Sequence, residues 1–477
     1  MSPSLSTHLS VKSVHIYLSI YLSIYLSIYL SIYHFYIPLH LTPAFLGTCY
    51  SKFVWLPHQY HPEQIHLSYG DNPTQMVITW VTLWPTNSTV VEYGISRLDT
   101  ETQGKETLFI DGGSEKRHIY MHRVKLTSLI PGQKYFYHCG GEKGWSALYF
   151  FAAMKSGQSW SPRLAVYGDM GNIKGRSIPR LQEWAQKGKF DAVLHVGDLA
   201  YNLDTDNARM GDEFMRQIEP IAAYVPYMVS PGNHEEKYNF SNYKSRFSMP
   251  QNGDGENMYY SFDIGPVHVI SFSSEVYYFY IDYRYIDKMY DWLKRDLEVA
   301  NQPENRAVRP WIIALAHKPM YCTNSDDQPI CFNKYNPVRV GSSLQVGRGL
   351  EDLFCNYGVD IYFAGHEHSY ERLLPLYDFM VRNGSFHHPY TNPKATVHIV
   401  TGSAGNQEAQ DPFKHVDHPF SVYHSDDYGF TMMYVHNVTH IHLQQVSDDK
   451  GGKIIDDFWV IKEKVGAPNF KCKKLRN

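Results

Sequence analysis

Residues 361–372 read Ile-Tyr-Phe-Ala-Gly-His-Glu-His-Ser-Tyr-Glu-Arg, and this stretch decides the class of fold. An apolar run of the length of a short buried strand is followed by a glycine and then by a His-x-His pair. Histidine is the most common metal ligand among side chains, and ligands bind at the carboxyl ends of strands in open α/β sheets. The stretch therefore predicts a strand that ends in a candidate metal site.

The same arrangement occurs four more times nearer the N-terminus. The apolar runs and the side chains that follow them are 164–167 with Asp169, 192–196 with Asp198 and Tyr201, 227–230 with Asn233 and His234, and 311–316 with His317. A single Gly-Asp is usually a turn, and a single buried His is usually a core residue. Five such endings in order favour a shared site, because the carboxyl ends of neighbouring strands converge on one point.

Helical stretches separate these runs. Between residues 284 and 300, apolar side chains recur at helical spacing, at Ile286, Met289, Tyr290, Leu293 and Leu297. Alternating strands and helices predict an α/β layered domain from about residue 162, with its sheet covered on both faces. Upstream, residues 62–154 contain short β-branched and aromatic runs separated by turns, which predict a small all-β sandwich.

The types of side chain at the five endings indicate the chemistry. Glycine precedes four of the endings, where it lets the backbone turn sharply and approach a ligand closely. Carboxylate, imidazole, amide and phenol groups suit a pair of borderline-to-hard ions better than calcium or a thiolate-bound zinc. Two such ions about 3.5–4 Å apart clamp the attacking and leaving oxygens of a displacement at phosphorus. The sequence therefore predicts a phosphoester hydrolase.

Five short motifs resemble the sequence blocks of the purple acid phosphatases, a family of the metallophosphoesterase superfamily. They are GDMG at 168–171, GDLAY at 197–201, GNHE at 232–235, AHKPMY at 316–321 and GHEHSYER at 365–372. Over about residues 62–465, the chain is most similar to the animal, plant-like high-molecular-weight branch of iron/zinc purple acid phosphatase-like proteins. The resemblance implies an α/β catalytic domain, a metallophosphoesterase β-sandwich flanked by helices, preceded by an all-β fibronectin type III-like sandwich.

The resemblance also implies an Fe(III) site and a shared carboxylate. Asp169, Tyr201 and His368 match the ferric ligands, and the Tyr201 phenolate would give the purple charge-transfer colour. Asp198 matches the carboxylate that bridges both ions. Tyr201 separates this family from the protein serine/threonine phosphatases, which carry GDxxDRG where residues 197–203 read Gly-Asp-Leu-Ala-Tyr-Asn-Leu.

The remaining motif residues imply a divalent site and a substrate site. By resemblance, Asn233, His317 and His366 hold a divalent Zn, Fe or Mn ion, and Asn233 also contacts substrate. His234 is the implied catalytic residue, which contacts the substrate phosphate or the leaving oxygen. Many relatives carry a further substrate-contacting His after the fourth block, and approximate alignment places Lys334 there. A Lys binds phosphate as a point cation but is a poor proton donor at pH 5–6.

Together these features predict an acid phosphatase that hydrolyses small phosphate monoesters. The expected reaction is direct attack by a metal-activated hydroxide at an Fe(III)–M(II) centre. One alternative is a phosphodiesterase or nucleotidase, since specificity in this superfamily depends on loops around the site. A second alternative is a binding or adhesion protein that acts through the sandwich domain, which the complete set of ligand positions disfavours.

The N-terminal residues 1–61 form a low-complexity apolar segment outside the resemblance. Residues 17–32 repeat Tyr-Leu-Ser-Ile, as a translated ATCT repeat would, and no Asp, Glu, Lys or Arg lies between Lys12 and Lys52. The segment is predicted to be a signal peptide or anchor, with a non-targeting artefact as the alternative. Membrane association is expected only if it stays as an uncleaved anchor. Residues 466–477 are predicted to form a basic tail, after a catalytic domain over 162–465.

Composition and local motifs indicate the compartment and the partners. The net charge of −4 gives no basic surface for nucleic acid, and nothing in the composition predicts the oligomeric state. Cys322 and Cys331 are spaced to close a short disulfide loop in an oxidising compartment. Candidate N-glycosylation sites occur at Asn87, Asn239, Asn383 and Asn437. We therefore expect a secreted or lysosomal protein that acts on small phosphorylated substrates.

Overall fold

The computed structural model describes residues 58–279, 283–324, 330–331, 333–341, 347–413, 418–465 and 470. The predicted signal or anchor and the basic tail lie outside these residues, apart from positions 58–61 and 470. The chain separates into the units Met1–Trp55 and Leu56–Asn477, and only the second is described here. None of its described helices is long and apolar enough to cross a membrane.

The first part of this unit is a β-sandwich of two antiparallel sheets. One sheet has the order β1-β2-β6-β5, formed by Glu63–Tyr69, Met76–Thr82, His118–Leu126 and Lys105–Ile110. The other contains β4 (Thr100–Gln103), β3 (Val90–Gly94), β7 (Lys134–Gly141), β8 (Gly144–Trp145) and β9 (Tyr149–Ala152). Alternation along β7 buries Tyr135, Tyr137 and Cys139 on one face. β6 ends at Leu126, and the chain turns at Ser128 with a φ of 58°.

The second part contains two mixed sheets that share one hydrophobic core. The six-stranded sheet has the order β12-β11-β10-β22-β23-β24, formed by Tyr227–Ser230, Ala192–Val196, Arg163–Tyr167, Gly429–Val435, His440–Ser447 and Lys453–Ile461. The seven-stranded sheet has the order β13-β14-β15-β16-β20-β17-β21, formed by Tyr259–Ile264, Val267–Phe272, Trp311–Leu315, Ile361–Ala364, Val397–Thr401, Tyr370–Leu373 and Ser421–Ser425. A two-stranded ribbon joins β18 (Leu376–Tyr377) to β19 (Met380–Val381). The five apolar runs are thus divided between two sheets, although the alternation of strands and helices alone had predicted a single sheet.

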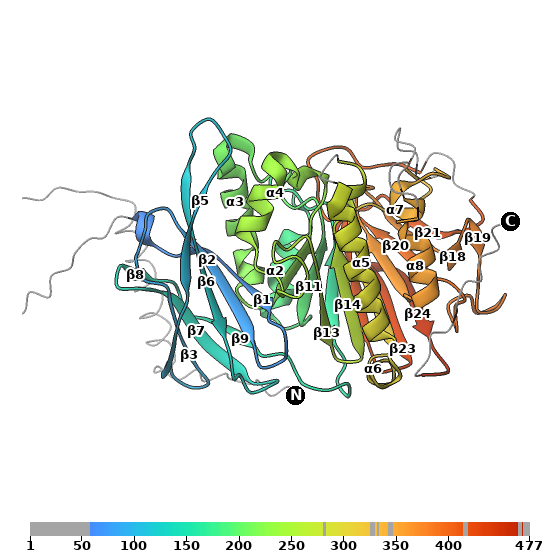
Figure 1. The fold of residues 1–477 in the computed structure, drawn as a ribbon, viewed down its shortest axis with the longest axis horizontal. Helices are drawn as coiled ribbons and strands as arrows, with labels where there is room; N and C mark the ends of the chain where they lie inside the picture. Colours follow the sequence, from blue (N-terminus) through green and yellow to red (C-terminus); the bar gives the residue numbers. More distant parts are fainter. Residues whose placement is uncertain are drawn as a thin grey trace, which may run out of the picture. The chain divides into compact units, whose positions relative to one another are not determined.

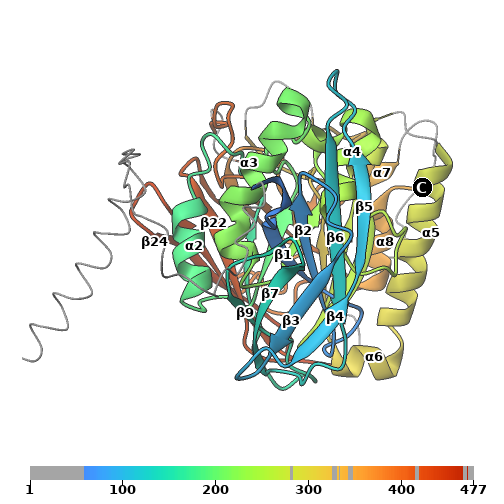
Figure 2. The same cartoon turned by 90° about the vertical axis from the view of Figure 1, so that its left-hand side faces the viewer.

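Helices cover the outer faces of this double sheet, α2 and α3 on one side and α5 and α8 on the other (Figures 1 and 2). Trp184 of α2 (Ile178–Gln186) packs on Phe430, and Phe214 of α3 (Thr205–Ala222) packs on His195. Phe354 of α8 (Leu350–Tyr357) packs on Phe272 across the seven-stranded sheet. The apolar spacing noted for 284–300 belongs to α5 (Tyr283–Ala300), which buries Ile286, Met289, Leu293 and Leu297. The other helices are α4 (Lys237–Arg246), α6 (Pro303–Val308) and α7 (Pro337–Val340), with single 3-10 turns at His58–Tyr60, Asn233–Glu235 and Glu275–Tyr277.

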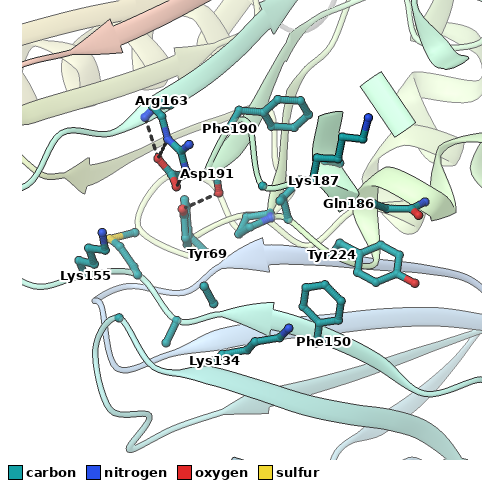
Figure 3. Close-up of a pocket in the computed structure, with 18 of the residues that line it drawn as sticks. Tyr69, Lys134, Phe150, Lys155, Arg163, Gln186, Lys187, Phe190, Asp191 and Tyr224 are labelled. Atoms are coloured by element: carbon teal, nitrogen blue, oxygen red, sulfur yellow. Dashed lines mark hydrogen bonds and ion pairs between the residues drawn. The ribbon is translucent and has the colours of Figure 1, made fainter. Parts of the chain in front are cut away.

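The sandwich is joined to the double sheet mainly through α3 and the residues that follow it. Tyr149 donates a hydrogen bond of 2.6 Å to Glu219, and Tyr137 donates one of 2.8 Å to the carbonyl of Ala223. Between the two parts lies a cavity of about 330 Å³, in which Arg163 pairs with Asp191 (Figure 3). These two residues lie at the amino ends of β10 and β11, so this cavity is at the opposite end of the strands from the predicted ligands.

Cys322 and Cys331 are joined by a disulfide with a Cα–Cα distance of 4.4 Å. Of the four sequon asparagines, Asn87, Asn239 and Asn437 are exposed and Asn383 is half-buried. The secretion and glycosylation that these features favour stay predictions.

A buried ion cluster connects the C-terminal strand to the strand that carries the His-x-His pair. Lys462, just after β24, lies 2.7 Å from Asp360 Oδ1, and Asp360 Oδ2 also accepts the backbone N–H of Ile312. Arg306 lies 3.7 Å from the same carboxylate, and all three charged side chains are 1% exposed. Burial lowers the pKa of Lys462 to about 8, against the opposing effect of Asp360. The cluster therefore depends on the Asp360 charge.

Replacing Asp360 by Asn should destabilise the fold by about 3–5 kcal/mol, because it leaves Lys462 and Arg306 buried without a counter-charge. Denaturant or thermal unfolding of the purified protein measures the effect. The matched control is Asp99→Asn in the exposed Arg97–Asp99 pair, where no measurable change in stability is expected. Equal effects of the two substitutions would contradict the role given to the cluster.

Candidate metal centre and active site

The seven predicted ligands all lie beyond the carboxyl ends of β10, β11, β12, β15 and β16. One group consists of Asp169, Tyr201 and His368. Tyr201 Oη lies 2.7 Å from His368 Nε2 and 3.2 Å from Asp169 Oδ1, and the His368 Nε2–Asp169 Oδ1 distance is 3.6 Å. All three side chains are buried. They form a compact set of one carboxylate, one phenol and one imidazole.

The second group consists of Asn233, His317 and His366, with Asp198 beside it. His317 Nε2 lies 3.1 Å from Asp198 Oδ2 and 3.0 Å from Asn233 Oδ1. Ligand atoms of Asp198, His317 and His366 all lie within 4.8 Å of one another. The structure thus brings together every residue that the sequence predicted as a ligand.

Four of these residues have a left-handed backbone, which costs energy for any residue other than glycine. The φ angles are 58° at Asp169, 50° at Asp198, 50° at Tyr201 and 71° at His366. Such conformations cost on the order of 1–3 kcal/mol each and persist where the surrounding structure enforces them. Their concentration at the ligand positions is a further indication that this end of the sheets is the functional site.

Glycine is required where two ligand loops approach each other. A Cβ on Gly232 would lie 2.1 Å from Asp198 Oδ1, and a Cβ on Gly365 would lie 2.4 Å from Asp169 Oδ2. Any larger residue would therefore push a carboxylate out of place. This confirms the close approach that glycine before a ligand had indicated.

The buried acidic side chains of the site favour positive charge beside them. Burial alone would raise the pKa of Asp198, but the adjacent His317 holds it well below its usual value, so Asp198 is a carboxylate. Burial opposes charging His317, yet Asp198 and Asp169 together raise the pKa of His317 to about 10. Metal cations at these atoms would neutralise the same acidic groups. The oxygen and nitrogen donors, with no thiolate among them, fit an Fe(III) and a borderline divalent ion.

Hydrogen bonds outside the ligands fix the direction of the imidazoles. His317 Nδ1 lies 3.0 Å from the carbonyl of Val196, and His368 Nδ1 lies 2.9 Å from the carbonyl of Ala409. A carbonyl only accepts, so Nδ1 carries the hydrogen in both rings. Nε2 is therefore the atom that each ring directs to the centre, and it would bind a metal once the metal replaces any proton on it.

Glu235 holds the loops after β11 and β12 together. Its carboxylate accepts the backbone N–H groups of Gly232, Asp198 and Leu199, each at 2.9 Å. The side chain is buried, and burial together with the Asp198 charge raises the pKa of Glu235 to about 8. Glu235 follows the predicted His234 directly, but nothing in the sequence marked it as a support for Asp198.

His234 lies at the rim of the centre. Its Nδ1 is 2.6 Å from Asn202 Oδ1, and its ring packs against Tyr201 at a centroid distance of 4.3 Å. Its Nε2 faces the site, 3.8 Å from Asp198 Oδ2 and 3.6 Å from Glu408 Oε1. The side chain is 20% exposed, so it can reach a molecule that enters from solvent.

Sequence reasoning missed two charged residues at the site. Glu408 lies 3.9 Å from His368 and comes from a loop that follows no ligand motif. Lys318 lies 3.0 Å from His366 Nε2 and stands inside the fourth motif, directly after His317. Lys334 is exposed, and its role in substrate binding stays a prediction.

Geometry and donor set define a calcineurin-like phosphoesterase with two adjacent metal half-sites. The family model for that domain matches residues 162–370. Models for the purple acid phosphatase N-terminal domain and the iron/zinc purple acid phosphatase-like protein C region match residues 62–153 and 395–457.

Among curated proteins, the chain is 52% identical to human (Homo sapiens) acid phosphatase type 7 over 409 residues, covering 85% of this chain and 92% of that protein. It is 49% identical to the Danio rerio protein of the same name, covering 88% and 96% of the two chains. The solved purple acid phosphatase from yellow lupin (Lupinus luteus) seeds has a TM-score of 0.73 at 24% identity, covering 88% of this chain and 78% of its own, and so shares the fold. The chain belongs to the purple acid phosphatase family.

Replacing Glu235 by Gln should weaken metal retention by about 10- to 100-fold, because the amide cannot accept all three backbone N–H groups that position Asp198. Elemental analysis after dialysis against a weak chelator measures the effect. The adjacent Glu236 is exposed, so Glu236→Gln is the matched control and should retain both metals. Unchanged metal retention in Glu235→Gln would show that the loops hold Asp198 without this carboxylate.

Proposed function

We propose that the protein hydrolyses small phosphate monoesters at an Fe(III)–M(II) centre, as an acid phosphatase. The observation that carries this proposal is that two sets of donors lie at the same end of the sheets, Asp198 with His317 and Asn233 in one and Asp169, Tyr201 and His368 in the other. Asp169, Tyr201 and His368 hold the ferric ion. Asn233, His317 and His366 hold the divalent ion, which is zinc, iron or manganese.

Bound ions in such a pair activate water for attack on phosphorus and neutralise charge on the phosphoryl group. The protein's own residues do the rest. Asp198 stays ionised between the half-sites, and the Nδ1 contacts of His317 and His368 keep their Nε2 atoms directed inward. Asn202 holds His234 by Nδ1, so His234 Nε2 contacts the phosphate or passes a proton to the leaving oxygen.

We also propose the cellular setting and the domain limits. The sequons and the Cys322–Cys331 disulfide support a secreted or lysosomal protein, in which residues 1–61 are a signal or anchor segment. The sandwich is assigned to residues 62–154 and the catalytic domain to 162–465. Strand bounds from Glu63 to Ala152 and from Arg163 to Ile461 support these limits.

The purified protein should contain two metals per chain and show a visible band from phenolate-to-Fe(III) charge transfer. Tyr201→Phe should remove the band, because no phenolate then reaches the ferric ion, and should lower hydrolysis of p-nitrophenyl phosphate by about 10-fold or more. Visible spectra, elemental analysis and initial rates measure these effects. The exposed Tyr335 provides the control variant Tyr335→Phe, which should stay coloured.

A colourless protein that is replete with metal would contradict the role given to Tyr201. Faster cleavage of bis(p-nitrophenyl) phosphate than of p-nitrophenyl phosphate would favour the phosphodiesterase alternative instead.

Lys334→His should raise the rate on alkyl phosphates by about 10-fold or more relative to p-nitrophenyl phosphate. An alkoxide leaving group needs a proton, which a His supplies at pH 5–6 and a Lys does not. Initial rates on the two substrates give the ratio. An unchanged ratio would show that position 334 does not contact the leaving group.

A further inference from the structure

A cavity of about 490 Å³ opens beside the divalent half-site. Its inner end is formed by Asn233, His366 and Lys318, two metal ligands and one ammonium group. Its walls include Tyr278, Phe279, Ile330 and Pro337, which are aromatic or aliphatic. The volume falls within the usual range for small-molecule sites, and apart from Asn333 the rest of the lining is aromatic or aliphatic.

Lys318 holds a positive charge at the boundary between ligands and cavity. Its Nζ lies 3.3 Å from Asn233 Oδ1 and 3.0 Å from His366 Nε2. Glu275 Oε2 lies 3.9 Å from Lys318 Nζ, and the centroid of the Tyr278 ring lies 5.0 Å from it. Both groups stabilise the ammonium. The side chain is 6% exposed, so this charge is directed at the site and not at bulk solvent.

Tyr278 lines the cavity and carries a buried hydroxyl. Its hydroxyl is buried and has no hydrogen-bond partner among the residues that the structure describes. Burial raises the pKa of Tyr278, so the group stays a phenol and can donate.

We propose that this cavity is the leaving-group subsite of the phosphatase, selecting monoesters of aromatic or other apolar alcohols, and that Lys318 binds a phosphoryl oxygen of the substrate. The proposal rests on the phosphatase function. A phosphoryl group that meets Asn233 and His366 directs its ester oxygen away from them, towards Tyr278 and Phe279. An apolar alcohol then leaves water for an apolar wall, whereas a sugar or another polyol has few partners there.

Lys318 is suited to this contact because an ammonium neutralises phosphate charge as a point cation. The same position also allows a different role, in which the ammonium weakens binding of the divalent ion by repulsion. Phosphate affinity and metal content distinguish the two roles.

The test compares phenylphosphonate with methylphosphonate, two dianions that are not hydrolysed and differ in the apolar group. Isothermal titration on the metal-loaded full-length protein should show phenylphosphonate binding about 10-fold more tightly. Phe279→Ala should reduce that preference to about threefold or less. Ile330→Ala is the second variant in case Phe279→Ala does not fold. The control is Phe386→Ala, at a Phe that is 91% exposed, which should keep the full preference.

Lys318→Met should weaken both phosphonates by about 10-fold or more at unchanged metal content, and Lys318→Arg should restore most of the affinity. Higher divalent content in Lys318→Met without weaker phosphonate binding would overturn the assigned role of Lys318. Equal affinities of the wild-type protein for both phosphonates, or a preference that survives Phe279→Ala and Ile330→Ala, would overturn the subsite. Hydrolysis of glycerol 2-phosphate, followed in parallel, shows whether the phosphatase function itself stands in each case.

Discussion

The carboxylate of Asp198 is the constraint on which the rest of the structure depends. It is almost fully buried and ionised, and an isolated buried charge of this kind is far too costly to keep. His317 lies 3.1 Å away, the N–H of His234 donates to Asp198 Oδ1 at 3.0 Å, and Glu235 fixes the backbone N–H of Asp198. The groups that neutralise and position this one carboxylate therefore hold the loops after β11, β12 and β15 close together. The metal ions complete this compensation.

The double sheet beneath the site holds the strained backbone of the ligand loops in place. Left-handed conformations at Asp169, Asp198, Tyr201 and His366 are each unfavourable alone. The strands that precede them, β10, β11 and β16, are buried along their length, so the loops have fixed starting points. The packed core of the double sheet thus holds the loops in conformations that would otherwise relax. Ligands that stand directly after a buried strand have their backbone positions fixed in this way.

The ligand set could be predicted from the sequence because each ligand stands next to the apolar run that positions it. Periodicity likewise predicted the buried face of α5. Glu408 and Tyr278 could not be found in this way, since they come from loops whose path depends on tertiary packing. Local patterns likewise did not show the division of the strands between two sheets, which the resemblance to the purple acid phosphatases implied, because β10 pairs with β22 and not with a neighbour from the other sheet. Local patterns determine which residues end a strand, but not which distant strand lies beside it.

The position of β22 has a consequence for how the protein is made. β10 begins the catalytic region, and its free edge pairs with residues 431–434 near the end of the chain. The loop that carries Asp169 is closed in the same way, since Gly168 donates to the carbonyl of Thr401 and Asn406 donates to that of Asp169, each at 2.8 Å. During synthesis the first metal ligands emerge long before the strands that complete their surroundings. The metal centre therefore assembles only after almost the whole chain has left the ribosome, in the compartment where folding is completed.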